Sequence, residues 1–259
     1  MIKLINDDCL IAMTKIEENS IDLTVTSPPY DNLRTYNGNN AQWGEAVWKS
    51  VIEELYTVTK PGGVVVWVVG DATIKGSETG TSFKQALWAK ECGFNLHDTM
   101  IYQKPSSPFP GVVRYMQVFE YMFVFSKGNP KTTNIILDRK NNNAGHVFRN
   151  TIRQKDGSLK QQVTNPCKDF GERYNIWLIA NGEQIKEHPA TFPEQLAADH
   201  IHSWSNEGDL VYDCFMGSGT TAKMAHLQKR NWIGSEMSKE YCEIAEKRIK
   251  PYLEQTRLF

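Results

Sequence analysis

The stretch Val64-Val65-Val66-Trp67-Val68-Val69 holds six apolar residues in succession. A strand with one face in water alternates apolar and polar side chains, whereas an unbroken apolar run is typical of a strand covered on both faces. Strands of this kind lie in the middle of parallel sheets whose two faces carry helices. The stretch therefore predicts an α/β fold and supplies its central strand.

Strand and helix patterns alternate on both sides of this central strand. The alternation indicates a single doubly wound, mostly parallel sheet of seven strands. In such sheets ligands bind at the carboxyl ends of the strands. The other predicted strands cover residues 2–6, 21–26, 95–103, 120–126, 209–214 and 232–236, and the predicted helices cover residues 8–15, 45–59, 81–91, 192–204, 220–229 and 238–249.

Residues 129–175 interrupt this alternation. They contain nine lysines and arginines against four acids, a net charge of +5 in a chain whose total is −1. The segment is either a solvated surface loop or a region that binds a polyanion, and both interpretations stay open at this point. We therefore predict one domain built from residues 1–128 and 176–259, with residues 129–175 inserted into it.

Composition excludes several classes of protein. The chain has 259 residues, of which 40% are hydrophobic and 23% charged, as in an ordinary globular protein. No apolar run approaches the roughly 20 residues of a membrane-spanning helix, and the first residues do not resemble a signal peptide. The five cysteines are scattered and lack the spacing of a metal site. We expect a cytoplasmic protein without membrane association or bound metal.

The first motif that indicates chemistry is Thr26-Ser27-Pro28-Pro29-Tyr30, directly after the strand over residues 21–26. Two prolines in a row hold the backbone extended and remove two N–H donors. The Ser27 hydroxyl and the Pro28 carbonyl can then accept the two N–H groups of an aromatic amine, while the Tyr30 ring stacks on its base. Taken alone, a Pro-Pro turn without function is an equally good interpretation.

The second motif is the glycine loop Asp213-Cys214-Phe215-Met216-Gly217-Ser218-Gly219-Thr220. Glycines let the backbone approach a ligand closely, and the N–H groups at the start of the next helix face that ligand. Glu236, at the end of the following strand, suits the two hydroxyls of a ribose. The loop lacks the ending of a phosphate-binding loop and has too few glycines for a dinucleotide fingerprint. S-adenosylmethionine, which carries no phosphate, fits better than these or than a bare structural turn.

Together the two motifs resemble those of the S-adenosylmethionine-dependent DNA amino-methyltransferases, which modify cytosine N4 or adenine N6. The catalytic motif precedes the glycine loop, which is similar to the permuted β-class order of that family. The likeness covers nearly the whole chain, although Cys214 stands where the family usually has proline. It implies a Rossmann-like methyltransferase of prokaryotic or phage origin, with S-adenosyl-L-methionine as cofactor and DNA as partner. It leaves a homodimer and a cognate restriction nuclease open as further partners.

The resemblance gives roles to residues at each motif. Ser27, Pro28, Pro29 and Tyr30 are the expected catalytic residues. The expected DNA-binding residues are Arg34, Tyr36, Lys140, Arg149, Arg153, Lys155 and Lys160, of which the last five lie where β-class members carry a target-recognition region. The expected cofactor-binding residues are Asp8, Cys9, Thr26, Pro189, Thr191, Phe192, Asp213, Phe215, Gly217, Ser218, Gly219, Thr220 and Glu236.

The residue before the two prolines bears on which amine is modified. Family members with serine there are often cytosine-N4 enzymes, and those with aspartate more often act on adenine N6, so Ser27 favours cytosine. Adenine N6 is the alternative, and methylation of RNA or of a protein amide is a more distant one. The base must leave the helical stack, because its amine is otherwise paired. The hypothesis requires the Pro-Pro turn and the glycine loop to meet at one edge of the sheet.

Overall fold

The structure is a computed structural model that describes residues 2–29, 43–106, 114–180 and 193–255. The chain forms two compact units. The larger unit combines residues 1–134 with residues 175–259, and the smaller unit consists of residues 135–174.

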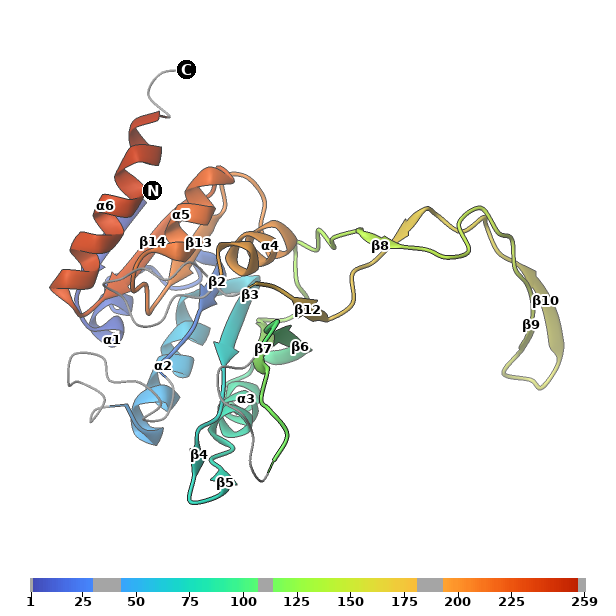
Figure 1. The fold of residues 1–259 in the computed structure, drawn as a ribbon, viewed down its shortest axis with the longest axis horizontal. Helices are drawn as coiled ribbons and strands as arrows, with labels where there is room; N and C mark the ends of the chain where they lie inside the picture. The colour runs from blue at the N-terminus through green and yellow to red at the C-terminus, as the bar shows by residue number, and fades with distance from the viewer. Residues whose placement is uncertain (1, 30–42, 107–113, 181–192, 256–259) are drawn as a thin grey trace. The chain divides into compact units, whose positions relative to one another are not determined.

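A sheet of eight strands forms the centre of the larger unit, in the order β1-β14-β13-β2-β3-β7-β6-β12 (Figure 1). β7 runs antiparallel to both of its neighbours, and all other neighbouring pairs are parallel. The fold is therefore α/β with a mixed, mostly parallel sheet. The strands are β1 (Ile2–Asn6), β2 (Ile21–Thr26), β3 (Thr59–Val69), β6 (Asn95–Gln103), β7 (Phe119–Ser126), β12 (Ile176–Leu178), β13 (Leu210–Asp213) and β14 (Asn231–Glu236).

Helices cover both faces of this sheet. One face carries α1 (Cys9–Met13), α2 (Glu45–Val58) and α3 (Thr81–Glu91), and the other carries α4 (Glu194–Trp204), α5 (Thr220–Leu227) and α6 (Lys239–Gln255). In β3, Val65, Trp67 and Val69 belong to the first of these cores, whereas Val64, Val66 and Val68 belong to the second. None of these six residues is more than 2% exposed. The apolar run thus fills two cores at once, as its sequence predicts.

The predicted number of seven strands is wrong by one. β12 adds an eighth strand at the edge of the sheet, parallel to β6, with Ile176 opposite Ile101. Trp177 is buried, but Ile176 and Leu178 are 56% and 67% exposed. A strand of three residues with one inward side chain offers no pattern that distinguishes it from a loop. The prediction missed β12 for that reason.

Several element boundaries also differ from the sequence prediction, two of them by five residues or more. β3 begins at Thr59, ahead of Pro61-Gly62-Gly63, because Thr59 already pairs with Ile21 before the register shifts. α6 continues through Pro251 to Gln255. A short hairpin of β4 (Thr73–Ile74) and β5 (Ser77–Glu78) follows β3. No helix in the described parts of the chain is long and apolar enough to span a bilayer.

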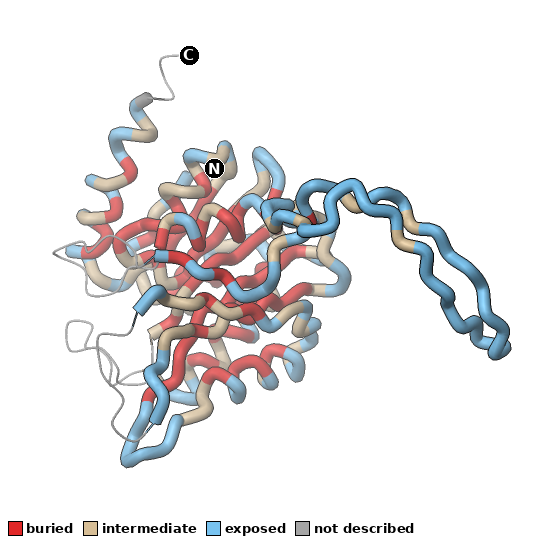
Figure 2. The backbone as a smooth tube through the Cα atoms, turned by 45° about the vertical axis from the view of Figure 1, so that its right-hand side comes forward, coloured by how far each residue is buried: buried red, intermediate tan, exposed pale blue. Residues whose placement is uncertain are grey.

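The smaller unit consists of two antiparallel ladders. β8 (Arg139–Lys140) pairs with β11 (Phe170–Gly171), and β9 (Arg149–Arg153) pairs with β10 (Leu159–Val163). Gly171 is its one buried residue, so the unit has no hydrophobic core of its own. Figure 2 shows this contrast, because the buried segments are concentrated in the larger unit.

Candidate active site

The carboxyl ends of β2 and β13 meet at one edge of the sheet, because the two strands are parallel neighbours. The Thr26 hydroxyl donates a hydrogen bond to Asp213 Oδ1 at 2.7 Å. The N–H of Phe215 donates to the same oxygen at 3.1 Å. One carboxylate oxygen therefore joins the residue before Ser27-Pro28-Pro29 to the first turn of the glycine loop.

Asp213 itself is turned into the protein, where it is 2% exposed. Burial raises the pKa of its carboxyl group to about 6, although the hydrogen bond from Thr26 opposes the shift. From this buried position the Asp213 carboxylate holds two segments in place, because Thr26 and the Phe215 N–H both bind it.

The Pro-Pro turn leaves β2 at this edge. Pro28 is buried, while Ser27 and Pro29 are half-buried. No part of the chain that the structure describes donates a hydrogen bond to the Pro28 carbonyl. Within the described residues, the Pro28 carbonyl is therefore left without a donor. Six predicted site residues lie outside the described residues. They are Tyr30 of the catalytic set, Arg34 and Tyr36 of the DNA-binding set, and Pro189, Thr191 and Phe192 of the cofactor-binding set.

Two glycines give the glycine loop its shape. Gly217 and Gly219 have φ angles of +49° and +80°, in the left-handed region where glycine is favoured. A Cβ atom on Gly219 would lie 3.0 Å from Ile249 Cδ1 and 3.1 Å from Ala245 Cβ, so α6 packs directly against the loop. Gly219 is also the N-cap of α5.

A third glycine, in β14, matters for the same loop and was not singled out in the sequence. A Cβ atom on Gly234 would lie 1.9 Å from Met216 Sδ. The Met216 side chain therefore occupies the space that a side chain at position 234 would need. The Met216 N–H also donates to the Ser235 carbonyl at 3.0 Å. The sequence signal was the glycine within a strand, which often marks the close approach of another group.

Glu236 closes the loop on its other side. Its Oε2 accepts a hydrogen bond from the Gly217 N–H at 2.9 Å, and its Oε1 accepts one from the Ser238 N–H at 2.8 Å. Burial raises the pKa of Glu236, while these backbone hydrogen bonds act in the opposite direction. Each carboxylate oxygen can accept a further hydrogen bond, so Glu236 remains able to bind two hydroxyl groups.

The N-terminal strand brings Asp8 and Cys9 to the same edge. β1 pairs with β14 so that Asn6 lies opposite Glu236. Asp8 caps α1, and its Oδ1 accepts a hydrogen bond from the Leu10 N–H at 2.8 Å. Cys9 is buried, and burial is the main reason that the pKa of its thiol rises to about 12. The thiol therefore stays protonated at neutral pH.

Arg248 of α6 holds the glycine loop from behind and was missed in the sequence. Its Nη1 donates to the Ser218 carbonyl and the Ser218 hydroxyl, both at 3.2 Å, and to the Thr220 hydroxyl at 2.9 Å. Its Nη2 forms an ion pair with Glu194, which also binds Lys223 at 2.7 Å. The side chains of Ser218 and Thr220 are therefore engaged within the protein, which leaves the backbone of the loop to face a ligand.

Aromatic rings form one wall beside the loop. The Phe215 ring meets the ring of Trp43 edge to face, with centroids 5.3 Å apart. It approaches the buried Trp67 of β3 in the same manner at 6.3 Å. These contacts fix the direction of the Phe215 ring at the end of β13 and add an apolar surface to the edge.

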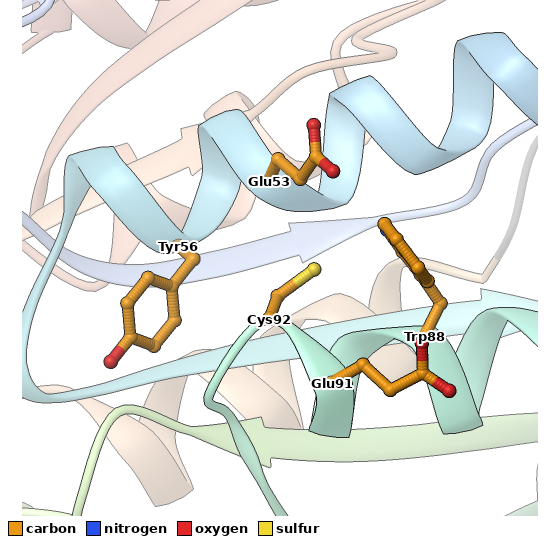
Figure 3. A pocket seen from close by; sticks show the side chains of 5 residues that line it. All are labelled: Glu53, Tyr56, Trp88, Glu91 and Cys92. Atoms are coloured by element: carbon orange, nitrogen blue, oxygen red, sulfur yellow. The ribbon is translucent and has the colours of Figure 1, made fainter.

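A hollow of about 480 Å³ lies away from this site, between the carboxyl-terminal halves of α2 and α3 (Figure 3). These helix ends lead into β3 and β6, so the hollow lies near the amino-terminal ends of these strands. Ser27 lies at the other end of the sheet, where β2 ends. Burial raises the pKa of the Cys92 thiol in it to about 11, which makes the group a poor nucleophile. The lining residues are Glu53, Tyr56, Trp88, Glu91 and Cys92.

The predicted DNA-binding residues in the smaller unit are all exposed. Lys140 lines a hollow of about 420 Å³ together with Asn141, Asn142 and Asn143. The other four lie on or between β9 and β10, and none of them forms an ion pair with a described residue. These four are Arg149, Arg153, Lys155 and Lys160.

A family model described as DNA methylase, N6/N4 type, matches residues 21–247 of the chain. The chain belongs to the N6/N4 DNA methylase family. Its match to this model spans both the Pro-Pro turn and the glycine loop, so the family suggested by these two motifs is confirmed. The particular base, cytosine or adenine, is not distinguished by a family that includes both types.

Individual relatives agree with this assignment. The orphan methyltransferase M.BamHII of Bacillus amyloliquefaciens is 58% identical over 249 residues, which cover 92% of each chain. Among solved structures, the cytosine-N4-specific PvuII DNA methyltransferase has a TM-score of 0.69 at 23% identity and covers 97% of this chain and 91% of its own. The complex of M1.HpyAVI with S-adenosylmethionine has a TM-score of 0.64 at 22% identity and covers 96% of this chain and 100% of its own. S-adenosyl-L-methionine is the methyl donor of this family, as predicted from the sequence.

Proposed function

We propose that this DNA methylase transfers a methyl group from S-adenosyl-L-methionine to the N4 amine of cytosine in DNA. The observation that carries the proposal is the hydrogen bond from Thr26 to Asp213, 2.7 Å long. It joins the strand end that bears Ser27-Pro28-Pro29 to the glycine loop, so a base held by the first and a cofactor held by the second are neighbours. Cytosine is favoured over adenine because serine, at Ser27, precedes the two prolines, which is the same argument as in the sequence analysis.

The residues at this edge suit the cofactor by their chemistry. Glu236 retains acceptor capacity and would bind the two ribose hydroxyls, and Asp8, two residues after Asn6 of the Asn6–Glu236 pair, would bind at the adenine end. Gly217 and Gly219 present backbone without side chains, since Arg248 holds Ser218 and Thr220 from behind. When bound, S-adenosyl-L-methionine supplies an electrophilic methyl group on a positively charged sulfur.

The Pro-Pro turn acts on the amine. In this proposal the Ser27 hydroxyl accepts one N–H of the amine, and the Pro28 carbonyl, which has no described partner, accepts the other. Holding both hydrogens favours a pyramidal nitrogen, whose lone pair would form the new N–C bond as the bond between the methyl carbon and sulfur breaks. S-adenosyl-L-homocysteine would be the leaving group, and one amine proton would pass to water. Tyr30 is proposed to stack on the flipped base.

Nucleoside analysis of DNA after incubation with the full chain and labelled cofactor tests this function. We expect N4-methyl-deoxycytidine. N6-methyl-deoxyadenosine would establish the alternative target, and the absence of any methylated nucleoside would contradict the proposal. RNA and protein substrates in parallel incubations separate the more distant alternatives.

Substitution of Ser27 tests the grip on the amine. Ser27→Ala is expected to lower kcat at least about tenfold with little change in the KM for cofactor, because the lost hydrogen bond is to the reacting amine. Ser77→Ala, at the exposed start of β5, is the matched control. Full activity of Ser27→Ala would remove the hydroxyl from the mechanism.

The smaller unit is proposed to recognise the target sequence, with Lys140, Arg149, Arg153, Lys155 and Lys160 as its cations. Lysine and arginine neutralise phosphates, and the amide side chains of the same segment can reach base edges. Homodimer formation is also a proposal, to be tested by light scattering across a range of protein concentrations.

A further inference from the structure

The smaller unit has two parts, which differ in whether their polar side chains form hydrogen bonds and ion pairs within the unit. Residues 138–148 and 164–174 bind one another. Arg173 forms an ion pair with Asp138, and Asn141 donates to the Lys168 carbonyl at 2.8 Å. Arg139 donates to the Glu172 carbonyl at 2.9 Å. This part of the unit is held together by its own polar groups.

Residues 149–163, which we term the ribbon, consist of β9, β10 and the turn between them. The turn is well formed, because the Gln154 N–H donates to the Ser158 carbonyl at 2.8 Å and Asp156 binds Ser158. In contrast, no side chain of β9 or β10 has a hydrogen bond or ion pair to any part of the chain that the structure describes. Every residue of both strands is exposed.

Such a ribbon is expected to need a partner. A lone two-stranded hairpin is at best marginally stable in water. The ribbon carries Arg149, Arg153, Lys155 and Lys160 against the single acid Asp156. Four unpaired cations and one acid, which is already bound to Ser158, are complementary to a polyanion. The major groove of DNA, roughly 12 Å wide, admits a two-stranded ribbon.

The register of the ribbon separates its side chains into two faces. Thr151 lies opposite Gln161, so these residues share a face, whereas Asn150 and Gln162 share the other. The Thr151 face carries both arginines and also Leu159 and Val163, which are 72% and 62% exposed. The Asn150 face has one cation, Lys160, and one apolar residue, Ile152, which is 44% exposed.

Both faces carry amide side chains that can pair with adenine, but the Thr151 face alone also carries arginines. Arginine pairs with guanine through two hydrogen bonds, glutamine pairs with adenine, and apolar groups contact the methyl group of thymine. This face also has the larger exposed apolar surface, which gains most from removal from water. We propose that the ribbon lies in the major groove with the Thr151 face toward the bases, where Arg149, Thr151, Arg153 and Gln161 determine the target sequence.

This inference rests on the proposed function, because it takes DNA as the substrate. A strand of five residues is about 17 Å long, at roughly 3.4 Å per residue. The rise of DNA is also about 3.4 Å per base pair, so the ribbon contacts no more than about five base pairs. The sequence determined by this face is therefore short.

Two adjacent glutamines provide a matched test. The full chain, its Gln161→Ala variant and its Gln162→Ala variant each methylate unmethylated genomic DNA, and the methylated positions are mapped by sequencing. Gln161→Ala is expected to lower discrimination at one position of the target by roughly five- to 150-fold, the range for one lost bidentate contact. Gln162→Ala is expected to leave discrimination within about twofold of the unchanged chain.

The outcomes separate this inference from the proposed function. Equal discrimination by all three chains would overturn the placement of the Thr151 face, even though DNA methylation itself was observed. Loss of discrimination in Gln162→Ala alone would establish the opposite face. If the unchanged chain placed no methyl group on DNA, the proposed function would fail and the inference with it. Thermal unfolding should be the same for both variants, because both side chains are exposed.

Discussion

The glycine loop over Asp213 to Thr220 and the ribbon over residues 149–163 are both short, and both are expected to bind a ligand. In the loop the polar side chains have partners within the protein: Asp213 binds Thr26, and Ser218 and Thr220 bind Arg248. In the two strands of the ribbon no side chain has such a partner among the described residues. The loop is fixed before a ligand arrives, whereas the ribbon keeps its polar groups in water.

This difference corresponds to what each part has to recognise. A cofactor has one structure, so a site for it gains from being rigid, because no binding energy is then lost in ordering it. A target sequence differs between related enzymes, and side chains that support no fold can be exchanged without loss of stability. Substitutions in the loop should therefore lower stability, and substitutions in the ribbon should alter DNA recognition alone.

The largest effect is expected from Gly234→Ala. Its Cβ would lie 1.9 Å from Met216 Sδ, so the glycine loop or β14 must move. We expect a loss of about 2 kcal/mol or more in the free energy of unfolding, with a weaker affinity for cofactor. Differential scanning calorimetry and cofactor titration measure the two. Gly44→Ala is the control, because no atom of the described residues lies within 4 Å of the added atom. Equal melting temperatures for the two variants would contradict the assigned role of Gly234.

The buried Asp213 gives a stability difference that depends on pH. Burial raises the pKa of Asp213 from 3.8 to about 6, so the folded protein binds this proton more tightly than the unfolded chain. This contribution to stability is present below about pH 4 and is lost as the pH rises through 6. Relative to Asp213→Asn, the unchanged chain should lose about 2–3 kcal/mol between pH 4 and pH 7.5. Urea unfolding of both chains at each pH measures the difference, and parallel curves would refute it.

Arg248→Met should have a smaller effect on stability and a clear one on the cofactor. It removes the hydrogen bonds to Ser218 and Thr220 and the ion pair with Glu194. We expect a loss of about 1–3 kcal/mol in unfolding free energy, and a rise of about tenfold in the Kd for cofactor. Lys250→Met, on an exposed position of the same helix, should change neither quantity. An unchanged Kd would mean that the loop holds its shape without Arg248.

The smallest effect on stability is expected in the ribbon. Arg153→Ala should leave the unfolding free energy within about 0.5 kcal/mol, because the side chain has no described partner. If Arg153 contacts a phosphate as well as a base, the slope of log Kd for DNA against log salt should fall by about one. Fluorescence anisotropy at several salt concentrations measures this slope. A loss of stability equal to that of Arg248→Met would erase the distinction between the loop and the ribbon.

The sequence predicted the sheet and the site to different extents. The run over Val64 to Val69 was sufficient to identify the central strand, because its length and its lack of polar residues leave one arrangement open. The eighth strand was missed, because Trp177 is its one buried residue. Position along the chain also predicted that the Pro-Pro turn and glycine loop share an edge, since parallel strands end on the same side.

What the sequence lacked was information on side-chain contacts. Arg248 sits in a polar helix among other charged residues, and only the packing of α6 on the loop reveals its three acceptors. The side chains of Asp213 and Ser218 have hydrogen-bond partners within the protein, and their role in binding the cofactor stays a prediction. Likewise, the two faces of the ribbon depend on the register of β9 with β10, which composition cannot provide.

The position of β1 as an outermost strand of the sheet has a consequence for folding during synthesis. Its one neighbour is β14, and Asn6 donates to the carbonyl of Glu236, 230 residues further along the chain. A ribosome adds about 5–20 residues per second, so the first strand waits on the order of ten to fifty seconds for the surface it joins. A nascent chain that has not yet reached β14 therefore lacks both the partner strand of β1 and Glu236 of the proposed cofactor site.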